Sequence, residues 1–112
     1  MTNDRVLVYL SGPLTAKHGF SVADNVNAGL KIYFDLIEAG VNALSPHLGA
    51  DRPEAFTINY ERWMAYDFAL IDVCTHIVML PRWETSAGAI RERDYALAHG
   101  KPVLVWPDVS FT

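Results

Sequence analysis

Two carboxylates and a short serine–glycine segment are the residues of this 112-residue chain whose types and spacing favour chemistry. Ser86 and Gly88 fall between an apolar run and a helical pattern, so they are expected at the start of a helix. The unpaired N–H groups and the positive dipole end of such a helix form a seat for an anion. Glu92 follows within the same helix, and Asp67 lies on the preceding one.

The sequence leaves two environments open for Glu92. Ala89 and Ala96, three residues before it and four after it, share its helical face, so Glu92 lies beside small apolar side chains. The glutamate then either points into a cleft or turns outward to join Arg91 and Arg93 in water, as most glutamates do.

A pair of carboxylates suits reaction at an anomeric carbon. One carboxylate can attack this carbon, whose transition state is cation-like, and form a covalent glycosyl-enzyme. The other, with its pKa raised by burial and by the first charge, can protonate a leaving base or hold a sugar hydroxyl. Asp67 and Glu92 are the candidate pair, with Tyr9 expected to converge on them from the first strand.

Other common chemistries lack their signatures. The histidines, which form no zinc spacing with one another or with Cys74, are His18, His47, His76 and His99. A phosphate P-loop and the dinucleotide glycine fingerprint are both absent, and no serine or cysteine carries the signature of an acyl-transfer triad. We therefore expect neither a metal nor a cofactor.

Apolar runs and helical patterns alternate along the chain. Strands are expected at residues 5–11, 41–45, 76–80 and 102–106, and helices at 21–39, 58–74 and 86–99. This alternation predicts an α/β domain with a parallel sheet, whose ligands collect at the carboxyl ends of the strands. The residues expected to converge there are Tyr9, Gly12, His47, Trp83 and Ser86, with Asp67 and Glu92 in reach.

Helical spacing predicts which faces are buried. The apolar stripe expected on the first helix is Val22, Val26, Leu30, Tyr33 and Ile37. The stripe expected on the second helix is Tyr60, Met64, Phe68 and Ile71. Asp67 should lie on or beside this second stripe, whereas Glu61 and Arg62 should be solvated.

Length and composition bound the remaining possibilities. We expect a single domain over residues 1–112, small enough that a homodimer or higher homo-oligomer would complete the site, with the helices around Trp63 and Trp83 as candidate interfaces. The net charge of −4 argues against a polymeric nucleic-acid partner. A single cysteine fits a reducing compartment, so a cytoplasmic protein is expected, and no apolar run is long enough to span a membrane.

Three segments resemble the nucleoside 2-deoxyribosyltransferase-like superfamily. The segment Val8-Tyr9-Leu10-Ser11-Gly12-Pro13 is similar to the family's opening strand and glycine turn, and Asp67 matches its sugar-contacting aspartate. Ser86-x-Gly88-x-x-x-Glu92 resembles the segment that ends in the family's nucleophilic glutamate, at a similar distance from the aspartate.

The resemblance implies a fold and a site. The fold is a three-layer Rossmann/flavodoxin-like sandwich with a four- to five-stranded, mainly parallel sheet. The implied substrate is a small nucleotide or nucleoside whose N-glycosidic bond is cleaved or transferred. The implied catalytic residues are Glu92, Asp67 and Tyr9, and the implied substrate-binding residues are Ser11, Gly12, Pro13, Trp83, Ser86 and Gly88.

The identity of residue 86 bears on the substrate. In this superfamily, enzymes that act on free nucleosides tend to carry aspartate there, whereas 5′-monophosphate N-glycosidases carry serine, which can donate a hydrogen bond to phosphate. Against this, Thr15 stands near the position of an arginine in the phosphate hydrolases, so Lys17 or a partner subunit would have to replace it. Pro13-Leu14 is more similar to the transferases.

The alternatives stay open at this point. Residues 80–89 are most similar to a small uncharacterised bacterial and phage branch, which favours a non-catalytic nucleotide-binding or sensor module as a second hypothesis. Group transfer at the Ser86 helix start is a third, although no metal or lysine apparatus accompanies it. Trp83 is a candidate to stack on a base, with core or interface packing as the other interpretation.

Overall fold

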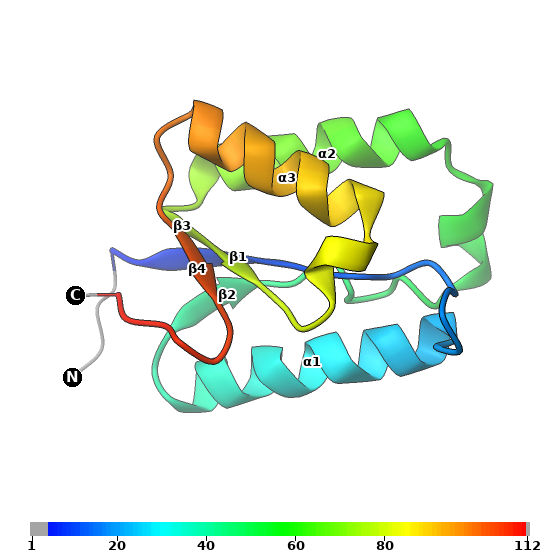
Figure 1. Cartoon of the computed structure of the whole chain (residues 1–112), viewed down its shortest axis with the longest axis horizontal. Coiled ribbons are helices and arrows are strands. Elements are labelled where there is room, and N and C mark those ends of the chain that lie inside the picture. The colour runs from blue at the N-terminus through cyan, green and yellow to red at the C-terminus, as the bar shows by residue number, and fades with distance from the viewer. Residues whose placement is uncertain (1–4, 112) are drawn as a thin grey trace.

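A central sheet of four parallel strands divides the structure, a computed structural model that describes residues 5–111 (Figure 1). The strands are β1 (Leu7–Ser11), β2 (Asn42–Leu44), β3 (His76–Met79) and β4 (Val103–Val105). Their spatial order is β2-β1-β3-β4, and every pairing is parallel. The predicted α/β fold with a parallel sheet is therefore confirmed.

Helices cover both faces of this sheet. α1 (Val22–Glu38) lies on one face, while α2 (Tyr60–Val73) and α3 (Ala87–Ala98) pack side by side on the other (Figure 1). Short 3₁₀ turns precede the last two helices, at η1 (Pro53–Thr57) and η2 (Trp83–Thr85). The layers form the expected three-layer sandwich.

Each face of the sheet has its own core because successive strand residues point to opposite sides. Val8, Leu10 and Val78 pack with α1 residues such as Ile32 and Leu36. On the other side, Tyr9 and Ile77 pack with residues of α2 and α3. Alternate residues of β1 therefore face α3, and these include Tyr9 and Ser11.

The predicted stripe of α1 is confirmed at Val26 and wrong at Ile37, while its other members, Val22, Leu30 and Tyr33, are half-buried beside the most buried face. The helix itself begins at the predicted cap, since Ser21 accepts from the Asp24 N–H in a capping box. The buried residues are Asn25, Val26, Gly29, Ile32 and Leu36, whereas Ile37 is 44% exposed. Hydrophobicity misled the prediction because an asparagine and a glycine occupy the buried face.

The predicted stripe of α2 is correct except at its first residue. Met64 and Ile71 are buried, but Tyr60 is half exposed at the beginning of the helix, where it lies near Arg91 of α3. Cys74 caps the carboxyl end of α2 and is buried.

Among residues 5–111, no helix combines the length and the apolarity that crossing a membrane requires.

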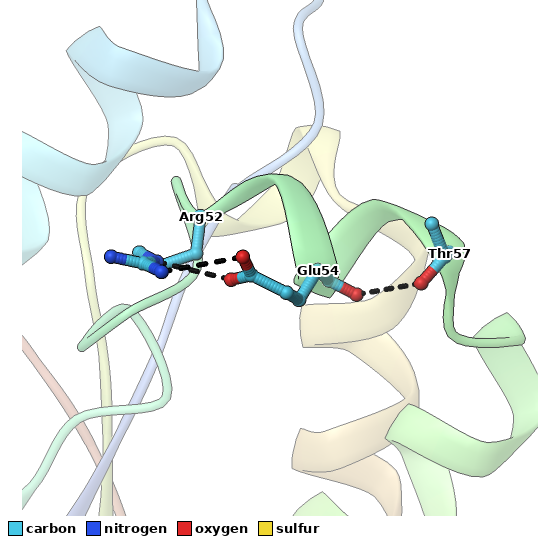
Figure 2. Close-up of polar contacts among 3 residues, drawn as sticks. All are labelled: Arg52, Glu54 and Thr57. Carbon is cyan, nitrogen blue, oxygen red and sulfur yellow. Dashed lines mark hydrogen bonds and ion pairs between the residues drawn. The ribbon is translucent and has the colours of Figure 1, made fainter.

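The loop between β2 and α2 contains η1, which the sequence did not predict. Arg52 forms a two-pronged ion pair with Glu54 there, and the Thr57 hydroxyl donates to the Glu54 carbonyl (Figure 2). Both charged side chains are 69% exposed, so the pair contributes little to stability. This surface arginine is useful below as a matched control.

The strand order reverses between β1 and β3. From β1 the chain passes through α1 to β2 on one side of β1, and from β2 it crosses through α2 to β3 on the other side. Ser11 and Met79 are paired at the carboxyl ends of these neighbouring strands, and the Leu80 N–H donates to the Ser11 carbonyl at 2.7 Å. Such a reversal point is where open α/β sheets bind ligands.

Gly29 allows a buried histidine to approach α1, which gives a test of the packing. A methyl group at Gly29 would lie 2.9 Å from Cγ of His47, whose ring is held by the Pro13 carbonyl. Gly29→Ala should therefore lower the free energy of unfolding by roughly 1–3 kcal/mol through overpacking, measured by urea denaturation.

Gly88→Ala is the matched control for this prediction. A methyl group there would meet its nearest atom at 3.6 Å, an ordinary contact, so the variant should be neutral or slightly stabilising. Equal stabilities for Gly29→Ala and the wild type would show that the ring of His47 is free to move.

Candidate active site

Glu92 is buried against the end of β1. The residue is only 5% exposed, and its side chain lies on the α3 face that also carries Ala89 and Ala96. The Tyr9 hydroxyl donates to Oε2 at 3.0 Å, and the Ser11 hydroxyl donates to Oε1 at 2.6 Å. Of the two environments that the sequence left open, the inward one is correct.

Arg91 and Arg93, the solvated neighbours that Glu92 could have joined, have partners elsewhere. Arg91 forms a two-pronged pair with Glu61 of α2, and Arg93 pairs with Asp94. These contacts account for the charged face of α3 without Glu92.

Asp67 brings the second carboxyl from α2. It is half-buried and lies close enough to Tyr9 and Glu92 to affect their titration. Burial raises the pKa of Asp67, while its interactions with Glu92 and Tyr9 act in the opposite direction. The two predicted carboxylates and the predicted tyrosine therefore come together from three different elements.

Burial dominates the electrostatics of Glu92. It raises the pKa of this carboxyl well above its ordinary value, and the hydrogen bonding and charge of Asp67 raise it further. The hydroxyls of Ser11 and Tyr9 oppose the shift because they stabilise the carboxylate. The pair therefore retains a proton on Glu92 at a pH where an ordinary glutamate has lost it.

Tyr9 remains a hydrogen-bond donor while Glu92 titrates. Burial raises the pKa of its hydroxyl well above 10, and the negative charges of Glu92 and Asp67 add to the effect. The phenol therefore keeps its proton and directs it at Oε2 of Glu92. Such a fixed donor holds one rotamer of the glutamate.

Ser86 caps the start of α3, the position at which the sequence predicted it. The Ser86 hydroxyl oxygen accepts from the Ala89 N–H at 3.1 Å, whereas the Thr85 hydroxyl donates to the Arg82 carbonyl. A hydroxyl can accept and donate at once, so Ser86 keeps a hydrogen available for a ligand. Gly88, in the first turn, is half-buried.

The turn after β1 is held by close packing. Gly12 lies so near the chain after β3 that a Cβ would be 2.8 Å from Cβ of Leu80. Pro13 is buried, and its carbonyl lies 3.0 Å from Nε2 of His47. His47 Nε2 thus acts as the donor, and its buried Nδ1 has no partner among the described residues.

Trp83 lies in η2, between the end of β3 and the start of α3. Its ring is half-buried, packs against the core on the α2–α3 face, and lies 5.0 Å from the guanidinium of Arg93. Packing is therefore one function of this tryptophan, and stacking on a base stays a prediction.

Two residues that the sequence interpretation did not single out lie at the edge of this site. Asn25 is 2% exposed and donates to the carbonyls of Leu14 and Thr15, while its own carbonyl oxygen accepts from Arg82. A signal existed for Asn25, since it shares a helical face with Gly29, Ile32 and Leu36. No pattern pointed to the backbone of Arg82, which is left-handed with φ of 65°.

The chemistry of the site rests on carboxyls and hydroxyls. Within residues 5–111, no three His, Cys, Asp or Glu side chains gather closely enough to hold a metal ion. The groups that converge at the carboxyl end of β1 are a carboxyl pair, a phenol, a serine hydroxyl and the first turn of α3.

The chain belongs to a family described as a domain of unknown function, DUF4406, whose model matches residues 6–105. The match spans all four strands and all three helices of the fold. No curated protein matches the chain.

The raised pKa of Glu92 predicts that this residue destabilises the protein at high pH. Its folded-state pKa lies above the unfolded value, so its favourable contribution is complete below the unfolded pKa and is lost as the pH rises through the folded one. Glu92→Gln should match the wild type near pH 4 and become progressively more stable above it, by about 1.4 kcal/mol for each unit of the shift. Melting temperatures across pH 4–9 test this.

Glu61→Gln provides a control of opposite sign. Arg91 lowers the pKa of Glu61, so this substitution should reduce stability slightly above the ordinary glutamate pKa, and the difference should disappear as the pH falls through the lowered folded-state pKa. A gap between Glu92→Gln and the wild type that does not change with pH would contradict the assignment of a protonated Glu92.

Proposed function

We propose that this protein cleaves or transfers the N-glycosidic bond of a small nucleoside or nucleoside 5′-monophosphate, with Glu92 as the nucleophile. The observation that carries the proposal is Glu92 itself, a buried carboxyl aimed by two hydroxyls and accompanied by a second carboxyl. The resemblance of residues 8–13, Asp67 and 86–92 to the nucleoside 2-deoxyribosyltransferase-like superfamily supports it independently.

The raised pKa of Glu92 fits a mechanism that begins with a proton relay. Glu92 passes its proton to Asp67, and the carboxylate then attacks C1′ of the sugar while the bond from C1′ to the base breaks. Asp67 gives the proton to the departing base, which makes the base a better leaving group. Tyr9 and Ser11 hold the attacking carboxylate in place.

The second half of the reaction restores both carboxyls. Water, or a second base, attacks C1′ of the glycosyl-enzyme from the side that the first base vacated. The ester bond to Glu92 breaks, and Asp67 takes up the proton that the incoming group releases. One water molecule is consumed in hydrolysis, and none is consumed in transfer.

A phosphorylated substrate receives support from the start of α3. Ser86 caps this helix with a hydroxyl hydrogen to spare, and the Lys17 ammonium donates to the adjacent Thr85 carbonyl at 3.2 Å. Lys17 is thus the residue of this chain proposed to replace the arginine that the resemblance to 5′-monophosphate N-glycosidases would place near Thr15. The Lys17 ammonium and the first turn of α3 together favour a 5′-phosphate.

The same burial supports a second function, that of a nucleotide-binding module without turnover. Glu92 is 5% exposed, and its raised pKa keeps the proton on this carboxyl to a higher pH than on an ordinary glutamate, whereas a nucleophile must be ionised. If no proton relay to Asp67 takes place, the fold binds its nucleotide and leaves it intact.

Base release distinguishes the two functions. Wild-type protein should release free base from at least one member of a panel of nucleosides and 5′-monophosphates, and Glu92→Ala should reduce the rate by roughly 10³-fold or more, because no nucleophile remains. Liquid chromatography of the products measures the rate. Glu61→Ala, an exposed glutamate on α2, should retain the wild-type rate.

Full activity in Glu92→Ala would overturn the mechanism. Tight binding of an unmodified nucleotide without base release over hours would transfer support to the binding module.

The pH profile of the reaction provides a second test. The reacting pair carries one proton, which Glu92 holds at rest and passes to Asp67, so activity should be lost at high pH when this proton leaves the pair. The raised pKa of Glu92 should therefore place the alkaline limb of kcat/KM above the range of an ordinary glutamate. Asp67→Asn cannot take up the proton and should remove that limb. An alkaline limb at the ordinary glutamate pKa would contradict the description of Glu92.

A further inference from the structure

Residues 14–20, called the strap here, cross from the end of β1 to the start of α1. The strap is closed on itself by two hydrogen bonds of 3.0 Å, one from the Lys17 N–H to the Phe20 carbonyl and one in the reverse direction. It also carries Lys17, the ammonium that lies beside the start of α3. The contacts that hold the strap in place therefore also hold the Lys17 ammonium in place.

Asn25 ties the strap to α1 through three hydrogen bonds of its side-chain amide. Its amide nitrogen donates to the carbonyls of Leu14 and Thr15, both at 3.1 Å, and its amide oxygen accepts from Arg82 at 2.8 Å. The side chain is buried, so each lost hydrogen bond would leave a polar group that water cannot reach to replace the partner. Asn25 thus joins three segments of the chain.

Arg82 extends this connection to the loop before α3. Its guanidinium lies 3.5 Å from the centre of the Phe20 ring while it donates to Asn25. Its backbone adopts the left-handed region that disfavours side chains, which persists only where surrounding contacts enforce it. The guanidinium contacts Phe20 and Asn25, and the Arg82 carbonyl accepts from the N–H and the hydroxyl of Thr85.

We propose that Asn25 and Arg82 form a clamp that holds the strap against the loop before α3 and thereby keeps Lys17 beside Ser86. The two are positioning residues, and through Lys17 they set the preference of the site for 5′-phosphorylated over unphosphorylated substrates. This specificity role rests on the function proposed above, whereas the mechanical role does not.

Hydrogen exchange tests the mechanical role directly. Arg82→Met removes the guanidinium but keeps a long side chain over Phe20, and it should accelerate exchange of the Lys17 and Phe20 amides by roughly tenfold or more. Asn25→Asp keeps the oxygen that faces Arg82 but lacks the N–H donors for the strap, so it should have the same effect. Arg52→Met, which removes an exposed arginine paired with Glu54, should change neither amide (Figure 2).

The specificity role is tested by kinetics on a matched pair, one nucleoside and its own 5′-monophosphate. Both clamp variants should reduce kcat/KM for the monophosphate about tenfold, chiefly through KM, and leave the nucleoside rate nearly unchanged. Lys17→Met should reproduce this loss with no faster exchange in the amide of Phe20, because it leaves the clamp intact. If Arg82→Met does not fold, Arg82→Lys replaces it.

Each outcome decides a separate claim. Unchanged exchange in both clamp variants would overturn the clamp. Faster exchange with an unchanged ratio of monophosphate to nucleoside rates would overturn its role in specificity. If the wild type releases base from neither substrate, the proposed function fails and the specificity role fails with it, while the exchange rates still decide whether the clamp exists.

Discussion

The burial of one carboxyl determines how this site is built. Glu92 lies beneath the reversal point of the sheet, where water does not stabilise its charge, so every group around it either supplies a hydrogen bond or adds to the shift of its pKa. Tyr9 and Ser11 reach it because alternate residues of a strand share one face. Asp67 reaches it because α2 and α3 pack side by side (Figure 1). A protein that needed only stability would have little reason to retain such a group.

The sequence predicted the fold and most of the residues at the site because both depend on local patterns. Apolar runs and helix caps locate strands and helices, and parallel strands bring their carboxyl ends to one edge. The sequence left the burial of Glu92 open for a physical reason. Helical spacing showed alanines on its face but could not show that the hydroxyls of Tyr9 and Ser11 donate to its carboxylate. The packing of α3 against β1 and β3 supplies that information.

The failures of prediction have a common origin. Asn25 and Gly29 occupy the buried face of α1 because one satisfies loop carbonyls and the other admits the ring of His47. A hydrophobicity pattern cannot recognise a buried position that is occupied by a hydrogen-bonding side chain or by a residue without a side chain. Arg82 was not predicted for a similar reason, since its guanidinium binds Asn25 and lies over Phe20, two partners that are distant in sequence. These residues join the segments that carry the predicted site, so they are where its geometry is set.

The central claim is that Glu92 forms a covalent bond to the sugar, and trapping that bond tests it most directly. A nucleoside or 5′-monophosphate with fluorine at C2′ should slow breakdown of the glycosyl-enzyme, because fluorine destabilises the cation-like transition state. Intact-protein and peptide mass spectrometry should then find one sugar attached to Glu92, and none on Glu92→Gln. Base release from this analogue without an adduct, or with an adduct on another residue, would contradict the account.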